Sequence, residues 1–141
     1  MTVTLEQIRA RYPGSETFSF GDSAALCESL LALVRAGRKT ATCSALRDVE
    51  RGGEPMPAVG RRDIALNWDG SPALVIETTE VAIRGFREVD ADFALAEGEN
   101  DTLAGWRRDH QGYFARNGGF DPDMMLVCER FRLVEDFGSP R

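Results

Sequence analysis

A long β-branched run behind a tight-turn signal constrains the fold of this 141-residue chain more than any other feature. The run covers residues 73–86 and is rich in Val, Ile and Thr, which favour an extended backbone. Asp69-Gly70 precedes it and is a strong signal for a hairpin. Before that turn, apolar residues alternate with charged or small ones, as in a strand, at Ile64, Leu66 and Trp68. We therefore expect an antiparallel hairpin here.

Segments with apolar residues at helical spacing lie on both sides of this hairpin in the sequence. They predict helices over residues 5–12, over 23–36, over 90–97, and from Asn100 or Asp101 to about Arg116. Residues 38–43 and 125–134 have strand character, and the Gly- and Pro-rich segment 44–62 predicts a loop with one helical turn. Four or five strands of this kind predict an α+β fold. We expect one domain over residues 1–141, a partly closed, mainly antiparallel β-barrel with helices packed at its rim.

The charge distribution bears on the kind of ligand. The net charge of −6 argues against a general affinity for nucleic acid. Residues 35–62 nevertheless hold seven basic and three acidic residues. This tract is either one side of a small cleft for an anionic ligand or a solvated, arginine-rich loop.

Cysteine usage and hydropathy bear on the compartment. Cys27, Cys43 and Cys128 are odd in number, far apart and set among apolar residues, so we expect reduced core thiols in a cytoplasmic protein. No cysteine pair has metal-ligand spacing. The sequence shows no signal peptide and no apolar run long enough to cross a bilayer, so no membrane partner is expected.

The segment Gly37–Ser44 follows the helix predicted over residues 23–36 and carries chemistry-bearing side chains. A helix that ends at glycine delivers the next residues at a defined angle. Lys39 is then close to the hydroxyls of Thr40 and Thr42. A desolvated lysine can lose its proton and act as a base. A basic residue at a helix C-terminus also has a purely structural role, because it interacts favourably with the helix dipole.

Several segments, in this order and at these separations, resemble the ASCH domain family of the PUA-like superfamily, in particular its small, bacterial-type, single-domain members. The resemblance covers about Phe18–Val134. The matching segments are Phe20–Asp22, Ala36–Ser44, Val75–Val81, Ala96–Leu103, Trp106-Arg107 and Leu126–Phe131. The resemblance implies a PUA-like β-barrel with helices at the rim and an association with RNA. Some members of the family hydrolyse single-stranded RNA, and others remove acyl groups from modified cytidine.

The resemblance also implies site residues. Lys39, Thr42 and Glu99 match residues that are catalytic in the amidohydrolase members, with Glu97 as the alternative glutamate. Expected substrate-binding residues are Arg38, Thr40, Ser44, Trp68, Glu97 and Arg107. Residues three apart in a regular strand point to opposite faces, so Lys39 and Thr42 can share a pocket only if the chain turns or bulges between them.

The sequence limits cofactors and some reaction types. His110 is the single histidine, which excludes acid–base chemistry by two histidines of one protomer and a zinc site with two such ligands. We expect it at the edge of the core. No cofactor is certain. A divalent metal ion held by Glu97 or Glu99 could assist hydrolysis, but the sequence contains no clear ligand set.

Three functions remain open. The first is binding of single-stranded RNA with hydrolytic, ribonuclease-type activity, placed first because the Thr40–Ser44 segment resembles the RNA-acting branch. The second is an amidohydrolase acting on 4-N-acylated cytosine nucleosides, which suits an acidic surface better. The third is a non-enzymatic reader of RNA or of a modified base. The expected partner is therefore single-stranded RNA or a modified nucleoside, and the sequence leaves the oligomeric state open.

Overall fold

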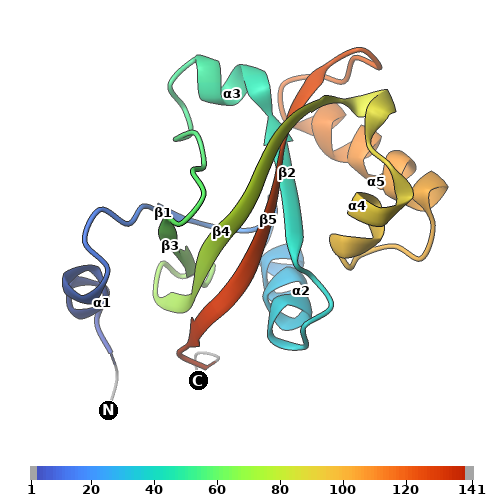
Figure 1. Ribbon diagram of the computed structural model, residues 1–141. Helices are drawn as coiled ribbons and strands as arrows, with labels where there is room; N and C mark the ends of the chain where they lie inside the picture. The colour runs from blue at the N-terminus through green and yellow to red at the C-terminus, as the bar shows by residue number, and fades with distance from the viewer. Residues whose placement is uncertain (1–2, 139–141) are drawn as a thin grey trace.

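A computed structural model describes residues 3–138 of the chain (Figure 1). The elements, in chain order, are α1 (Leu5–Arg11), β1 (Thr17–Phe18), α2 (Ala24–Arg35), β2 (Ala41–Ala45), α3 (Leu46–Glu50), β3 (Arg62–Leu66), β4 (Pro72–Gly85), the 3₁₀ turn η1 (Phe86–Glu88), α4 (Ala91–Ala96), α5 (Leu103–Arg116) and β5 (Met125–Asp136). Within residues 3–138, no helix has the length and the apolar character that crossing a bilayer requires.

The strands form one mixed, five-stranded sheet in the order β1-β3-β4-β5-β2. The predicted hairpin is present as the antiparallel pair β3–β4, β4 also pairs antiparallel with β5, and β5 with β2. The two-residue strand β1 runs parallel to β3. The α+β class is confirmed, but the expected partly closed barrel is wrong. Closure requires the two outer strands to pair, and β1 and β2 remain separate edges of the sheet.

Side-chain hydroxyls and carboxylates cap the N-termini of the helices, close to the positions predicted from the sequence. Ser23 caps α2 by accepting a hydrogen bond from the Leu26 N–H, and Thr4 caps α1 in the same manner. The cap of α5 is Thr102, which accepts from the Gly105 N–H, rather than the expected Asn100 or Asp101. The helical periodicity therefore located the helix correctly, while the predicted capping residue was a near neighbour of the observed one.

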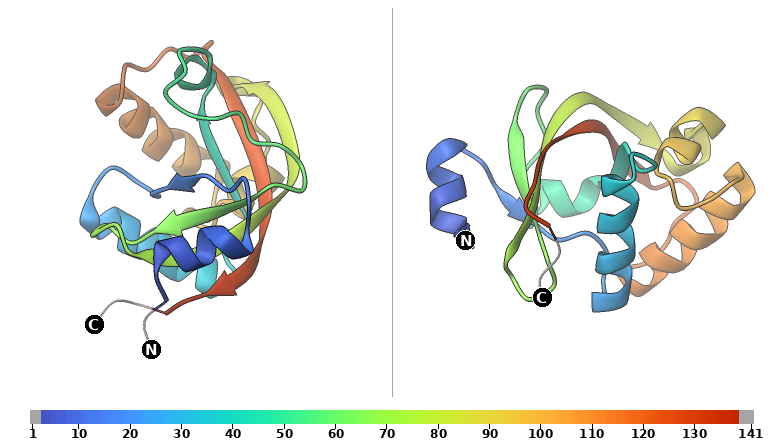
Figure 2. Two further views of the ribbon diagram at one scale, coloured as in Figure 1. Left: turned by 90° about the vertical axis from the view of Figure 1, so that its left-hand side faces the viewer. Right: turned by 90° about the horizontal axis from the view of Figure 1, so that it is seen from below.

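Helices cover both faces of the sheet around β3 and β4. Ile64 and Val75 are paired across these strands and pack with Ile8 of α1, all three fully buried. Their neighbours Ala65 and Leu74 point the other way and pack with α2. Figure 2 shows α1 and α2 on opposite sides of the sheet. The burial of both faces explains why these strands are apolar at most of their paired positions.

A second cluster joins β2 and β5 to α4 and α5. Trp106 is fully buried in it, and its ring lies 5.4 Å from that of Phe86 in a stacked arrangement. Ala41 and Ala45 of β2 are buried in the same cluster. Small residues on β2 allow the two helices to approach this edge of the sheet closely.

The connection from α2 to β2 fixes the direction of Lys39. Gly37 has φ +77°, a left-handed conformation that glycine adopts readily, and it ends the helix. The backbone N–H groups of Arg38 and Lys39 then both donate to the Leu33 carbonyl. Strand β2 begins only at Ala41, so Lys39 precedes the strand and is free of its alternation.

Candidate active site

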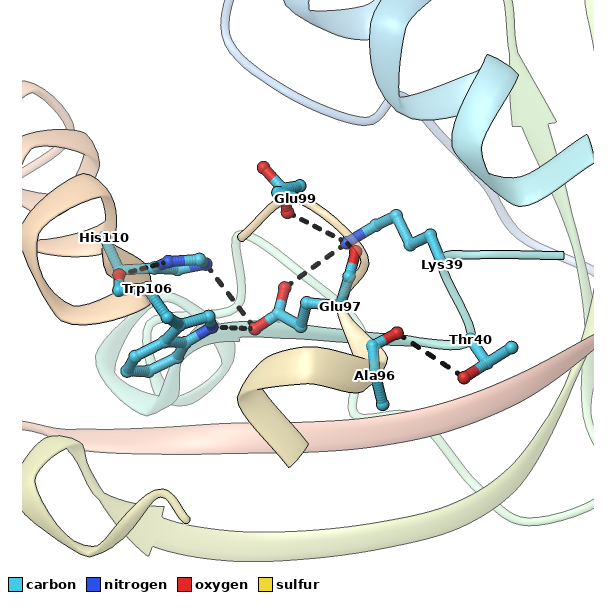
Figure 3. Close-up of polar contacts among 7 residues, drawn as sticks. All are labelled: Lys39, Thr40, Ala96, Glu97, Glu99, Trp106 and His110. Carbon is cyan, nitrogen blue, oxygen red and sulfur yellow. Dashed lines mark hydrogen bonds and ion pairs between the residues drawn. The ribbon is translucent and has the colours of Figure 1, made fainter. Parts of the chain in front are cut away.

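The side chain of Lys39 is buried among oxygen atoms (Figure 3). Its Nζ donates to the Glu97 main-chain carbonyl at 3.3 Å, to Glu97 Oε1 at 3.3 Å and to Glu99 Oε2 at 3.2 Å. An ammonium group has three N–H donors, so these contacts use all of them. Burial by itself lowers the pKa of Lys39, but the charges of Glu97 and Glu99 outweigh burial and raise it above its ordinary value. Lys39 is therefore a fixed positive charge, and the expected neutral amine acting as a base is not favoured.

Glu97 connects Lys39 to helix α5. Its Oε2 accepts a 2.8 Å hydrogen bond from the indole N–H of Trp106 and lies 3.5 Å from Nε2 of His110 (Figure 3). Burial by itself raises the pKa of Glu97, but Lys39, His110 and Trp106 together lower it to about 2. A fully buried carboxylate is thus kept ionised by two cationic partners and one neutral donor.

The hydrogen bonds of His110 define its protonation. Its Nδ1 lies 2.9 Å from the Trp106 carbonyl oxygen, which can only accept, so Nδ1 carries a proton. Its Nε2 then faces the Glu97 carboxylate, which favours a second proton on the ring. Burial lowers the pKa of His110, but the hydrogen bond and charge of Glu97 outweigh it and the net shift is upward. The imidazole ring also stacks on Trp106 at 4.2 Å, at the edge of the core as expected.

Gly98 makes the approach of the two glutamates to Lys39 sterically feasible. It has φ +79°, and a Cβ at this position would lie 2.5 Å from the Arg38 carbonyl oxygen and 2.9 Å from the Lys39 backbone nitrogen. Only glycine fits between these backbones. The backbone of Glu97–Glu99 therefore packs closely against that of Arg38 and Lys39, and this packing brings both carboxylates to the ammonium group of Lys39.

The buried cluster opens into a cavity of about 500 Å³. Lys39, Thr42 and Glu99 all line it, as do Ser44 and Glu97 from the expected substrate-binding set. Thr42 lies in β2, which begins only at Ala41, and Lys39 precedes the strand, so both residues reach the same cavity despite their spacing of three. A cavity of this size accommodates a nucleoside-sized ligand.

The other expected substrate-binding residues lie outside the cavity. Arg38 and Arg107 are exposed, and Thr40 donates to the Ala96 carbonyl at 3.4 Å. Trp68 is 51% exposed at the β3–β4 turn, away from the cavity wall. The turn and helix positions of these residues were predicted, but their direction relative to Lys39 depends on packing between distant segments.

The cavity wall is acidic. Seven acidic residues line it within residues 3–138, against three cationic ones. The acidic residues are Glu16, Asp48, Glu54, Asp63, Glu97, Glu99 and Glu129, and the cationic ones are Lys39, Arg61 and the protonated His110. Lys39 is paired with Glu97 and Glu99, and Arg61 with Asp63 at 2.9 Å. Of the seven basic residues in 35–62, only Lys39 and Arg61 line the cavity, so of the two alternatives for this tract the basic side of a cleft does not form.

Three residues missed in the sequence as site residues line the cavity near Lys39 and Thr42. They are Cys43, His110 and Glu129. Burial raises the pKa of the Cys43 thiol well above its usual value, so it is a poor nucleophile. For Glu129 alone the sequence held a signal of its place in the cavity. Val127, Glu129 and Phe131 alternate along a strand, so a carboxylate lies among apolar residues on one face.

Within residues 3–138, Cys43, Glu97 and His110 also form a group that could hold a metal ion. One ligand atom from each lies within 4.8 Å of the other two. They come from β2, the end of α4 and α5, so no sequence spacing could reveal them. In the arrangement described here Glu97 already interacts with Lys39 and His110, and a dication would have to compete with both.

Comparisons with known proteins place this arrangement in a family. A sequence model of the ASCH domain matches residues 16–135. The crystal structure of an ASCH domain from Lactobacillus crispatus JV V101 is 34% identical, with 94% of this chain and 87% of that chain covered and a TM-score of 0.80. Protein EF3133 of Enterococcus faecalis V583 is also 34% identical, covering 94% of this chain and 86% of that one, with a TM-score of 0.81.

A more distant structure shares the fold alone. A tyrosine-to-phenylalanine mutant of the Zymomonas mobilis protein ZmASCH is 12% identical, covering 86% of this chain and 76% of that one, with a TM-score of 0.54. No curated protein sequence gives a significant match. The chain belongs to the ASCH domain family, which is associated with RNA binding.

Proposed function

We propose that this protein is an amidohydrolase that removes the acyl group from 4-N-acylated cytosine nucleosides. The observation that supports this proposal most is the charge of the cavity wall. Acidic residues outnumber cationic ones there, and Lys39, Arg61 and His110 are all already paired with carboxylates. Such a wall repels phosphates and accepts a neutral nucleoside that offers N–H and O–H donors. The resemblance of Lys39, Thr42 and Glu99 to the catalytic residues of amidohydrolase members supports the same function.

Glu99 is the general base in this proposal. One of its carboxylate oxygens is held by Lys39, and its side chain is 24% exposed at the cavity. The second oxygen takes a proton from the attacking water while the water oxygen bonds to the acyl carbon. The C–N bond then breaks, and the same proton passes to the departing exocyclic nitrogen. The products are a carboxylic acid and the cytosine nucleoside.

Lys39 and Thr42 stabilise the reaction centre in different ways. All three donors of Lys39 are used, so its contribution is a fixed positive charge beside the negative charge that develops on the acyl oxygen. The hydroxyl of Thr42 supplies the hydrogen bond to that oxygen. No further cofactor enters this scheme.

The test is incubation of the purified protein with 4-N-acetylcytidine, with acetate and cytidine quantified by chromatography. We expect turnover by the wild-type protein, loss in both K39A and E99Q, and little dependence on salt. Absence of acetate release by the wild-type protein would rule out the proposal.

Hydrolysis of single-stranded RNA is the second candidate, and the association of the ASCH family with RNA binding favours it. The same samples are therefore incubated with a mixed-sequence single-stranded RNA. If the wild-type protein cleaves the RNA but releases no acetate from the nucleoside, and K39A and E99Q do not cleave the RNA, RNA hydrolysis replaces the first proposal. Binding without any turnover would instead support a reader.

A further inference from the structure

Glu129 faces the same cavity as the proposed catalytic residues without a partner of opposite charge. It lies on β5 directly across from Thr42 of β2, and these two strands run side by side in Figure 1. Residues directly opposite in an antiparallel pair point to the same face, with Cβ atoms about 5 Å apart. Thr42, Ser44, Val127 and Glu129 all line the cavity, as this register requires.

The carboxyl group of Glu129 is held in a defined orientation from behind. The buried hydroxyl of Thr78 on β4 donates a hydrogen bond to Glu129 Oε1. Within residues 3–138, no lysine or arginine lies within ion-pair distance of Glu129, and no other hydrogen bond to its side chain is present. Oε2 is therefore available to a ligand in the cavity.

The hydrogen-bonding groups of a protonated Glu129 are complementary to one edge of the cytosine ring. Burial raises the pKa of Glu129, with Asp63 adding to the rise, while Thr78 and Arg61 act against it. The rise makes the neutral carboxyl easier to form than in a free glutamate, and the neutral form has one O–H donor and one carbonyl acceptor. Because Thr78 donates to Oε1, Oε2 is the oxygen that carries the proton in this neutral form. A donor beside an acceptor is the complement of the cytosine ring edge, where the ring nitrogen N3 accepts and the exocyclic N4–H donates.

We propose that the Glu129 carboxyl group binds the N3–N4 edge of the cytosine ring and so selects the nucleoside whose amide is hydrolysed. Oε2–H donates to N3, and Oε1 accepts from the N4–H group. This inference rests on the proposed amidohydrolase function and adds a specificity-determining residue to it. It also orients the scissile amide, since the ring edge held by Glu129 carries the amide nitrogen.

The test compares 4-N-acetylcytidine with its 3-deaza analogue, in which a C–H group replaces N3, on wild type, E129L and E129Q. The wild-type protein should prefer the parent substrate in kcat/KM by about ten- to hundredfold, as expected for a lost bidentate contact. E129L should raise KM and lose this preference. E129Q should keep most of it, because a carboxamide also offers a donor and an acceptor on one edge.

A merely structural role of Glu129 would lower both activities equally and leave the preference unchanged, since coupling appears only where residue and ligand atom interact. An unchanged preference in E129L would therefore overturn the inference while leaving the hydrolase proposal intact. E135Q, altered on the same strand but outside the cavity lining, is the matched control and should behave as wild type. Thermal melting of each variant checks that it is folded.

A different readout applies if the wild-type protein hydrolyses neither substrate. The hydrolase proposal then fails, and cytidine binding is measured by calorimetry on wild type and E129L. Binding by the wild-type protein that weakens at least about tenfold in E129L supports the inference on its own. Equal binding by the two proteins, or no binding by the wild type, overturns it.

Discussion

Lys39 places a positive charge where water scarcely reaches, and the carboxylates of Glu97 and Glu99 compensate it. Lys39→Ala leaves Glu97 buried with one cationic partner fewer. We expect the free energy of unfolding to fall by about 3 kcal/mol, as for other broken buried ion pairs. We expect hydrolysis of 4-N-acetylcytidine to fall at least about a hundredfold, because a fixed charge at the reacting oxygen is lost. Urea unfolding and product analysis measure the two effects.

Arg87→Ala is the control for this substitution. Arg87 pairs with Asp123 at 3.4 Å, but both side chains are largely exposed. Such pairs contribute little, so stability should change by less than about 0.5 kcal/mol and turnover should stay at the wild-type level. Similar losses in the two variants would contradict the importance assigned to burial of Lys39.

His110 makes stability depend on pH near neutrality. The pKa of His110 is raised in the folded protein above its ordinary 6.5. The stabilisation is therefore complete below the ordinary value and is lost as the pH rises through the raised one. We expect the difference in unfolding free energy between wild type and His110→Gln to shrink as the pH rises from the ordinary pKa of 6.5 through the raised one. Urea unfolding across this range measures it, and a constant difference would show that Glu97 does not hold a charged imidazole.

Glu97 sets the acid limit of the same cluster. Its pKa is lowered from its ordinary 4.5 to about 2. Its stabilising contribution is present above the ordinary value and is lost as the pH falls toward the lowered one. The cluster is therefore most stable in the interval where Glu97 is ionised and His110 still carries both protons.

At the scale of elements, two glycines have almost the same φ but different surroundings. Replacing each by alanine distinguishes the cost of a left-handed backbone from the cost of a steric clash. Gly37 and Gly98 have φ +77° and +79°, but a Cβ at Gly37 would meet nothing within 4 Å. Gly37→Ala should cost about 1–2 kcal/mol for the left-handed conformation alone. Gly98→Ala should cost a further 1–3 kcal/mol, roughly, because the α4–α5 loop must move away from Arg38 and Lys39. Urea unfolding compares the two costs.

Turnover provides the second readout for these glycines. Displacement of the α4–α5 loop moves Glu97 and Glu99 relative to Lys39, so Gly98→Ala should lose hydrolysis. Gly37→Ala should retain most of it. Equal loss in both variants would mean that the conformation of the α2–β2 turn, and not the close backbone contact, positions the site.

Local signals explain which elements were predictable. The stripes of α2 and α5 and the Asp69-Gly70 turn depend on neighbours within a few residues, and the structure confirms all three. Strand β1 was missed because it has only two residues and is fixed by backbone pairing with β3, a strand far along the chain. The barrel expectation was wrong for a related reason, since closure depends on which strands become edges.

The site was predictable where the chain itself brings residues together. Lys39 and Thr42 lie in one segment after α2, and Glu97 and Glu99 share one loop. The contact between the segment and the loop was expected only through family resemblance. Glu129 and His110 reach the cavity through strand register and helix packing, which no local pattern encodes.

At the scale of the whole molecule, charge limits binding to RNA. The chain has a net charge of −6, and the basic side chains that line the cavity are paired. We expect a ten-residue single-stranded RNA to bind with a Kd no tighter than about 10⁻⁴ M at physiological salt, the weak end of non-specific binding. The slope of log K against log salt should correspond to two phosphate contacts or fewer, roughly. Fluorescence anisotropy over a salt series measures both quantities.

Cytidine is the comparison ligand in that experiment. A neutral nucleoside that enters the cavity should bind with little change over the same salt series, because no phosphate is involved. Tight RNA binding with a steep salt slope would contradict the expectation that charge limits RNA binding by this protein. It would point to a cationic surface elsewhere on the molecule.

The strand order has a consequence for how this protein behaves in crowded solution. The 14-residue β4 and the 12-residue β5 lie inside the sheet, whereas the edges are the two-residue β1 and the five-residue β2. Unpaired backbone at a sheet edge is what a second chain would need to extend the sheet into an aggregate. β1 and β2 offer little of it. In the described part of the chain, the stretch of β4 from Glu80 to Gly85 pairs with β5 on one side only, so this stretch is the margin where a further strand would add to the sheet.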